Sequence, residues 1–184
     1  YDKPTGFIGF GGLARSLRNL LKPFRTSIQV YDPWLTDSYL KQEGVQPVGL
    51  ENLLETSRFI YVLAVPTQSN RALLDRQKLE LIGDDSVFLL MSRAHVVDFE
   101  ALTDLLSQGR FKAGIDVYPQ EPLPLSHPIR QLPNVVLSSH RAGAIGEGLL
   151  NIGSLLVRDV EAVVSGRVPQ EFQTAQPEYI RERG

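Results

Sequence analysis

Residues 6–14 read G-F-I-G-F-G-G-L-A, and this stretch decides the fold. An apolar strand, a glycine turn and a helix follow one another, as at the phosphate-binding turn of dinucleotide-binding domains. Gly9 permits the tight turn, Gly11 lets backbone N–H groups approach a pyrophosphate, and Ala14 is small enough for close helix–strand packing. The residues of this turn that we expect to contact a dinucleotide are Gly9, Gly11, Gly12 and Leu13.

A second strand, S-I-Q-V-Y at residues 27–31, leads directly to Asp32. A carboxylate there can accept hydrogen bonds from both hydroxyls of an adenosine ribose, and it would repel a 2′-phosphate. Pro33 and Trp34 offer no arginine that would reverse this preference. A glycine-rich turn followed by an ordinary capping aspartate is the simpler interpretation. The complete strand–turn–helix–strand–acid unit favours a dinucleotide, and NAD over NADP.

Strand-like and helix-like segments alternate along the chain, which predicts a parallel sheet covered by helices on both faces. Pro66 closes the fourth strand and is expected to border the coenzyme site, and Asp98 is predicted to cap a helix. About seven strands fit a doubly wound α/β sheet with three layers. The first helix carries an apolar stripe formed by Leu13, Leu17, Leu20, Leu21 and Phe24. The other predicted helices cover residues 35–43, 50–56, 75–82, 99–107 and 145–165. Strands are predicted at residues 6–8, 27–31, 45–48, 59–65, 86–91, 112–117 and 134–138, with a proline-rich loop at 118–133.

Composition limits the function classes. The 184 residues are 42% hydrophobic, which is enough for a sizeable core, and a net charge of −2 gives no reason to expect nucleic acid as a partner. No apolar run approaches the ~20 residues that a membrane helix needs. The chain has no cysteine and three histidines, so we expect no metal site and favour a reducing, cytoplasmic location.

Three polar side chains follow predicted strands at the edge of the sheet where α/β proteins bind ligands. Arg93 offers a fork for a carboxylate, His140 can exchange a proton near neutral pH, and Glu121 would favour the charged imidazole. Together they have the chemistry that a 2-oxo acid needs to accept a hydride. Taken singly, a surface arginine, a turn glutamate and a capping histidine explain them equally well.

Several motifs in order then resemble the D-2-hydroxyacid dehydrogenase family. Residues 112–124 read K-A-G-I-D-V-Y-P-Q-E-P-L-P, and H-P at 127–128, L-P-N-V at 132–135 and S-H-R-A-G at 139–143 follow. The similarity runs from about Gly6 to Pro169. It implies a seven-stranded coenzyme domain that uses NAD, acts on a small 2-oxo or 2-hydroxy acid and forms homodimers.

The resemblance also implies roles for single residues. Arg93 matches the arginine that binds the substrate carboxylate, His140 the acid–base histidine, and Glu121 the carboxylate that supports it. Asp116 matches the acid near the nicotinamide carboxamide. The family commonly has Asn-Thr-x-Arg-Gly where this chain has L-M-S-R-A at residues 90–94, so contacts of Ser92 with the coenzyme are not carried over. We assign no catalytic role to His95 or His127.

Two other function classes stay open. A regulator or corepressor on the same fold would bind the nucleotide as a signal, and turnover of a 2-oxo acid would distinguish it from an enzyme. A different Rossmann oxidoreductase is the second class. A short-chain dehydrogenase would show Tyr-x-x-x-Lys, and no tyrosine here has lysine four residues on. A 3-hydroxyacid dehydrogenase would lack the pattern from Asp116 to His140.

Members of the family carry a separate substrate domain, built largely from residues before the glycine turn, and their active site lies between the domains. Because Tyr1 precedes the turn so closely, we expect that N-terminal domain to be absent from this chain. We expect residues 1–169 to form the dinucleotide-binding domain and residues 170–184 a C-terminal tail. This part alone is predicted to bind NAD and to reduce 2-oxo acids very poorly.

Overall fold

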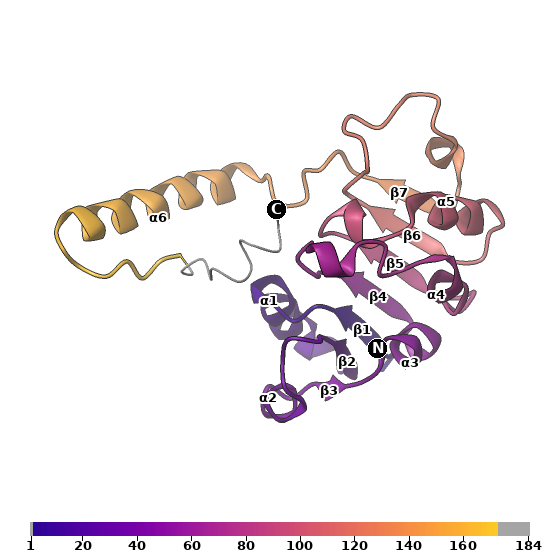
Figure 1. Ribbon diagram of the computed structural model, residues 1–184, viewed down its shortest axis with the longest axis horizontal. Helices are drawn as coiled ribbons and strands as arrows, with labels where there is room; N and C mark the ends of the chain where they lie inside the picture. The colour runs from indigo at the N-terminus through magenta and orange to yellow at the C-terminus, as the bar shows by residue number, and fades with distance from the viewer. Residues whose placement is uncertain (1, 173–184) are drawn as a thin grey trace.

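The computed structural model describes residues 2–172 and shows one parallel sheet of seven strands in the order β3-β2-β1-β4-β5-β6-β7 (Figure 1). Every neighbouring pair is parallel; Gly6 of β1, for example, lies opposite Gln29 of β2 and Ile60 of β4. The predicted doubly wound sheet is therefore confirmed. Its strands are β1 (Thr5–Ile8), β2 (Ile28–Tyr31), β3 (Gln46–Pro47), β4 (Phe59–Val62), β5 (Val87–Leu90), β6 (Lys112–Ile115) and β7 (Val135–Leu137).

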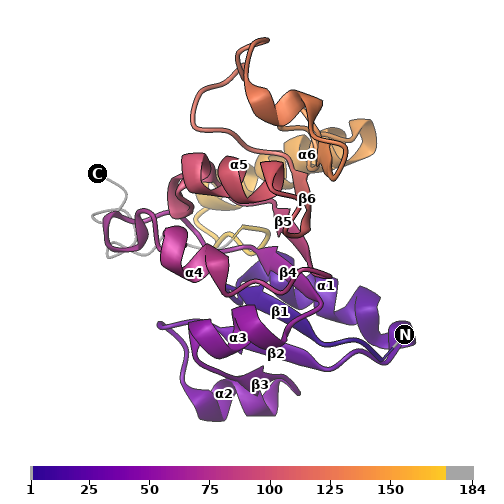
Figure 2. The same ribbon diagram turned by 90° about the vertical axis from the view of Figure 1, so that its right-hand side faces the viewer.

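Helices cover both faces of this sheet, and each face has its own hydrophobic core. Figure 2 shows α3, α4 and α5 along one face and α1 on the other. Side chains alternate along a strand. Phe7 therefore packs in the core under α1 and α2, whereas Ile8 packs in the core under α3, α4 and α5. The helices are α1 (Gly12–Leu21), α2 (Asp37–Gln42), α3 (Leu50–Thr56), α4 (Arg76–Glu80), α5 (Phe99–Ser107) and α6 (Gly146–Val164).

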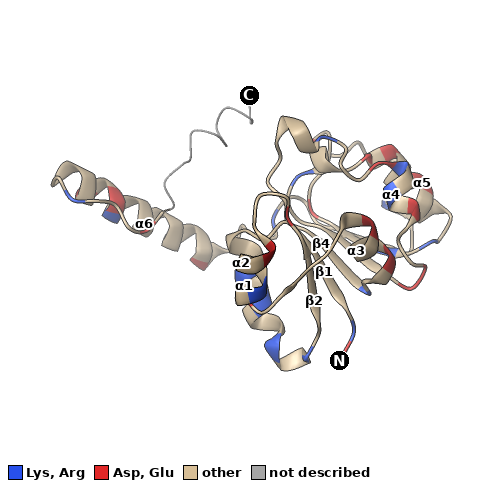
Figure 3. Ribbon diagram, turned by 60° about the horizontal axis from the view of Figure 1, so that its bottom comes forward, with Lys and Arg blue, Asp and Glu red and all other residues tan. Residues whose placement is uncertain are grey.

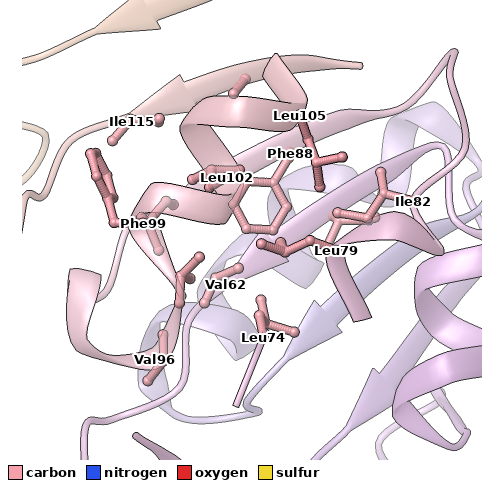
Figure 4. Close-up of a cluster of buried hydrophobic side chains, with 14 of the residues drawn as sticks. Val62, Leu74, Leu79, Ile82, Phe88, Val96, Phe99, Leu102, Leu105 and Ile115 are labelled. Atoms are coloured by element: carbon pink, nitrogen blue, oxygen red, sulfur yellow. The ribbon is translucent and has the colours of Figure 1, made fainter. Parts of the chain in front are cut away.

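The larger core lies under α3, α4 and α5, and Figure 4 shows its centre. Phe88 of β5 is fully buried there, between Leu79 of α4 and Leu102 of α5, and its ring lies 6.2 Å from that of Phe111. This packing makes the sheet a rigid platform, because a fully buried aromatic ring stabilises a core by several kcal/mol, of order 3–5 relative to alanine. The platform sets where the strand ends, and the loops beyond them, lie.

Two predicted helices match the structure at both ends, and several strands are shorter than predicted. Residues 50–56 and 99–107 are helical, and the N–H of Ala101 donates to the Asp98 carboxylate at 3.0 Å, which confirms the predicted cap. The fourth and sixth strands end three and two residues early, because the chain leaves the sheet as soon as the neighbouring strand ends. The segment 63–67 and Asp116 therefore belong to loops above the sheet. The proline-rich loop also contains a short 3-10 helix, Pro128–Gln131.

The apolar stripe predicted on the first helix is only partly a core face. Leu13, Leu20 and Phe24 are exposed, and α1 ends at Leu21, after which Lys22–Phe24 form a 3-10 turn. Ala14 is the buried residue of α1, with Leu17 and Leu21 packed beside it. The small third position of the glycine motif thus brings α1 close to the sheet, and Leu13 is left exposed.

Helix α6 extends away from the sheet, as Figure 1 shows. Asp159 is the point where the chain folds back on it: its carboxylate accepts hydrogen bonds from the backbone N–H groups of Gln170, Glu171 and Phe172 at 2.9–3.0 Å. Residues 173–184 of the predicted tail lie outside the described residues. No helix between residues 2 and 172 is long and apolar enough to cross a membrane. The exposed apolar side chains of α6 are Leu149, Leu150, Ile152, Leu156, Val157, Val160, Val163 and Val164.

Candidate functional site

The glycine turn between β1 and α1 has the geometry that its sequence predicts. Gly9 has a φ of +93°, and a Cβ built on it would lie 2.7 Å from backbone atoms of Ala64 in the loop after β4. Gly9 is therefore required by both conformation and space. A Cβ on Gly11 or Gly12 would instead meet nothing within 4 Å. The space above these two glycines is open to a ligand.

The N-terminus of α1 is suited to an anion. Gly11 is its N-cap and offers no side-chain cap, and the first turn contains no acidic residue. The first N–H groups of the helix, which carry the positive end of its dipole, are left for another acceptor. Figure 3 shows Lys and Arg positions in blue on the ribbon of α1. One basic residue, Arg18, lies in the last turn, away from this end of the helix, and pairs with Glu43 at 2.8 Å. These features fit the pyrophosphate of a dinucleotide.

Asp32 lies at the end of β2, beside the glycine turn. Its Oδ2 accepts a hydrogen bond from the backbone N–H of Phe10 at 2.8 Å, and its Oδ1 accepts one from Trp34 at 2.9 Å. Each carboxylate oxygen can accept a further hydrogen bond, so the ribose contact predicted for Asp32 is compatible with these bonds. The acid and the turn are thus joined directly, as a binding site for an adenosine ribose and its phosphate requires.

The structure brings His140 and Glu121 into contact. The imidazole Nδ1 lies 2.7 Å from Oε2 of Glu121, and the Tyr118 backbone N–H donates to Oε1 at 3.1 Å. The side chains come from different segments, the loop after β7 and the proline-rich loop after β6. They are 39% and 38% exposed, so the pair faces an open side of the domain.

Glu121 is held in its ionised form by these neighbours. The hydrogen bond from His140 lowers its pKa most, the Tyr118 N–H lowers it further, and the charges of His140 and Arg93 act in the same direction. An ionised carboxylate can only accept hydrogen bonds, so a neutral His140 must carry its proton on Nδ1. The other ring nitrogen, Nε2, is then the nitrogen available for a ligand.

Arg93 follows β5 and is exposed at the wall of a cleft above the sheet. Its Nη1 donates to the Ser92 carbonyl at 2.7 Å, which leaves other guanidinium N–H groups for a ligand. The cleft has a volume of about 1410 Å³. Its walls include Arg93, Leu13 and Pro66, together with residues 118–120, which directly precede Glu121. Leu13 and Pro66, both expected to border the coenzyme, therefore open onto the same space as Arg93.

Asp116, predicted to lie near the nicotinamide, comes directly after β6. It is 3% exposed, and its carboxylate accepts hydrogen bonds from the backbone N–H groups of Arg141 and Ala142. The oxygens retain accepting capacity, so the coenzyme contact stays a prediction.

The structural roles of Tyr118 and His95 were not predicted from the sequence. The Tyr118 hydroxyl contacts the carbonyls of Ile115 and Ser138 and so ties the ends of β6 and β7 together. The position of an aromatic residue just after a strand end is the signal that could have indicated this. The imidazole Nε2 of His95 lies 3.0 Å from the Thr67 carbonyl and fastens the loop after β4. His127 caps the 3-10 helix of the proline-rich loop, as the His-Pro turn suggests.

Comparison with known proteins places this arrangement in a family. Residues 1–142 match the model described as D-isomer specific 2-hydroxyacid dehydrogenase, NAD binding domain. The chain belongs to this family. The match covers every site residue from Gly9 to His140, and its description names NAD as the coenzyme, which agrees with the open turn above Gly11 and with Asp32.

Individual members of the 2-hydroxyacid dehydrogenase family are similar along nearly the whole chain. A glyoxylate reductase of Korarchaeum cryptofilum is 29% identical over 100% of this chain and 56% of its own length. A D-3-phosphoglycerate dehydrogenase of Archaeoglobus fulgidus is 28% identical over 89% of this chain and 31% of its length. The crystal structure of a phosphoglycerate oxidoreductase from Rhizobium etli superposes with a TM-score of 0.84 at 39% identity, covering 95% of this chain and 53% of that protein. The chain thus spans about half, or less, of these proteins.

Proposed function

We propose that this domain binds NAD(H) and carries the acid–base and carboxylate-binding residues of a D-2-hydroxyacid dehydrogenase, which interconverts a 2-oxo acid and a 2-hydroxy acid. The observation that carries the proposal is the contact of 2.7 Å between His140 and Glu121, with Arg93 close enough to lower the pKa of the same glutamate. An arginine, a histidine and a supporting carboxylate at the ends of neighbouring strands match the chemistry of this reaction. The regulatory alternative has no observation in its favour.

Each side chain has one task in this proposal. The coenzyme, when bound, supplies or accepts the hydride. Arg93 binds the substrate carboxylate with the N–H groups that Ser92 does not use. During reduction His140 donates the proton on Nε2 to the carbonyl oxygen, and in the reverse direction Nε2 takes it back from the hydroxyl. Glu121 stabilises the charged imidazole and keeps its ring orientation.

Asp32 is expected to select NAD over NADP. Replacement by alanine removes the charged acceptor of the ribose hydroxyls, so the NADH dissociation constant should rise by about 10- to 100-fold, in line with ~1–3 kcal/mol for such hydrogen bonds. NADPH affinity should not fall, because the repulsion of its 2′-phosphate is also gone. Fluorescence titrations with both coenzymes measure this. Asp37→Ala, on the exposed first turn of α2, is the matched control.

Asp32 also accepts hydrogen bonds from the N–H groups of Phe10 and Trp34, so its loss could alter the local structure. A second variant distinguishes this effect from the choice between the two coenzymes. Asp32→Asn keeps an acceptor oxygen and loses the charge. The difference in binding affinity between NADH and NADPH should become smaller in this variant, and its unfolding transition should stay close to that of the wild type. Unchanged discrimination in both variants would remove Asp32 from the ribose site.

Glu121→Gln is expected to shift the pH dependence of reduction. The lowered pKa of Glu121 means that its charge is present throughout the neutral range. Without that charge the imidazolium is less stable, so the fall in reductive rate with rising pH should begin at lower pH. A rate–pH profile between about pH 5 and 9 measures this change in the pH dependence. Glu147→Gln, at the exposed start of α6, should leave the profile unchanged.

We also propose that turnover requires a separate substrate domain, which the resemblance places before the glycine turn. The exposure of Glu121 and His140 and the greater length of the relatives support this. An opposing wall would complete the pocket and exclude water. The decisive assay compares this chain with the product of the complete gene, using NADH and a panel of glyoxylate, hydroxypyruvate and pyruvate. Turnover is expected only with the longer protein, and equal turnover by both would contradict this part of the proposal.

A homodimer and a cytoplasmic location complete the proposal. Val136, in the middle of β7, is 74% exposed, and the apolar side chains of α6 named above are exposed as well. Exposed apolar surface of this extent favours association with a second copy. The absence of cysteine from the sequence fits a reducing compartment. Sedimentation of the wild type and of Val136→Lys tests the dimer: the lysine variant should sediment as a monomer. A wild-type monomer at micromolar concentration would contradict it.

A further inference from the structure

The carboxylate of Asp116 accepts hydrogen bonds from the backbone that follows His140. Its Oδ1 accepts a hydrogen bond from the N–H of Arg141 at 2.9 Å, and its Oδ2 accepts one from the N–H of Ala142 at 3.1 Å. The side chain comes from the end of β6, whereas the two N–H groups come from the loop after β7. One buried anion therefore holds two consecutive peptide groups across the boundary between neighbouring strands.

The turn that these bonds hold begins with a strained residue. His140 has a φ of +54°, in the left-handed region that residues with a Cβ adopt only at a cost. Such a conformation persists only where surrounding contacts determine it. On its N-terminal side, the Ser138 N–H donates to the Ile115 carbonyl, and the Tyr118 hydroxyl contacts the Ser138 carbonyl. On its C-terminal side, the contacts to Asp116 perform this task.

We propose that Asp116 is a positioning residue, whose carboxylate fixes the turn at residues 140–142 so that Nδ1 of His140 meets Glu121. The assignment of His140 as the acid–base group rests on the function proposed above. The positioning itself concerns only groups of this domain. Without the two hydrogen bonds to Asp116, the backbone of His140 would leave its left-handed conformation. Its imidazole would then move away from Glu121, which it contacts at 2.7 Å.

The charge state of Asp116 agrees with this role. Burial raises the pKa of its carboxyl, but hydrogen bonds from Ser138, Arg141 and Ala142 and the nearby charge of His140 outweigh burial and lower it. Asp116 is therefore ionised at neutral pH, and an anion is a stronger acceptor for peptide N–H groups than a neutral acid. A second acidic group, Glu121, contacts the same imidazole directly, at 2.7 Å from Nδ1.

Nuclear magnetic resonance of the domain without coenzyme tests the inference directly. With only three histidines, the ring ¹⁵N resonances of His140 can be assigned by comparison with His140→Asn. In the wild type at high pH, the Nδ1–H tautomer is expected to predominate, and the Arg141 and Ala142 amides should exchange slowly with water. In Asp116→Ala, both amides should exchange about tenfold faster or more, and the tautomer preference should be lost.

Two further variants keep the test decisive. Asp116→Asn retains one acceptor oxygen and should protect one of the two amides, with an intermediate tautomer ratio. Asp159→Ala is the matched control, since it removes another low-exposure carboxylate that holds consecutive backbone N–H groups, on α6. It should leave His140 unchanged. If Asp116→Ala does not fold, Asp116→Asn and the amide exchange of the wild type still decide the question.

The inference is overturned if the wild-type amides exchange as freely as an unstructured loop, or if the Asp116 variants keep the wild-type tautomer and exchange rates. A change in NADH affinity alone, with both signals intact, would also overturn it and make Asp116 a coenzyme contact only. Failure of the proposed enzymatic function is a separate result, because it would appear as absent turnover by the complete protein with these signals unaffected.

Discussion

His140→Asn is expected to lower the rate of 2-oxo acid reduction by about 10²- to 10⁴-fold, the usual contribution of a positioned acid–base group. Asparagine tolerates the left-handed backbone of residue 140 better than most residues, so the turn should survive while the imidazole is lost. The loss should fall on kcat, because the carboxylate contact proposed for Arg93 is unchanged. Steady-state kinetics with NADH and the best 2-oxo acid of the panel, in a protein that includes the proposed substrate domain, provide the measurement.

Coenzyme binding and folding serve as controls for this variant. The affinity for NADH and the unfolding midpoint should both stay close to the wild type, because the His140 side chain is 39% exposed and pairs with the partly exposed Glu121. Wild-type reduction kinetics in His140→Asn would show that the proton comes from another group, and the pairing with Glu121 would then be structural.

Gly9→Ala is expected to destabilise the domain by about 3 kcal/mol or more. The left-handed conformation costs a residue with a Cβ about 1–3 kcal/mol, and a further ~1–3 kcal/mol comes from displacing the backbone that the new atom would overlap. That backbone belongs to Ala64, whose N and Cα would lie 2.7 Å from the added carbon. Urea unfolding measures the change as a lower midpoint, and NADH binding should weaken with it.

Two other glycines separate the contributions. Gly44 also has a positive φ, +74°, but a Cβ there would meet nothing within 4 Å, so Gly44→Ala should cost only about 1 kcal/mol from conformation alone. Gly11→Ala should leave stability unchanged and weaken NADH binding, because the added methyl group enters the open space above the turn. Equal destabilisation by Gly9→Ala and Gly44→Ala would contradict the close approach to Ala64.

Local patterns were sufficient for much of the fold. The alternation of apolar strands and helices predicts the parallel order of the sheet, and the spacing from Gly9 to Asp32 predicts a turn and an acid that prove to be joined by the Phe10 N–H. Helix α5 was predicted correctly at both ends, because Asp98 and Gly109 mark its limits by local chemistry. Strand ends were predicted less well, since a strand stops where its neighbour stops, and that neighbour is distant in sequence.

What the sequence by itself determined is the set of chemical groups. These are a glycine turn with no acidic residue in the first turn of the helix that follows it, an aspartate after the second strand, and an arginine, a glutamate and a histidine placed after later strands. Only the tertiary structure decided which of them meet. Nineteen residues separate Glu121 from His140, and their contact depends on β6 and β7 lying side by side. Asp116 shows the same limit, because its partners at residues 141 and 142 are backbone N–H groups, which every residue except proline carries. Sequence patterns show which side chains are present and how apolar residues repeat locally. Contacts across strands depend instead on strand pairing, burial and the path of the loops.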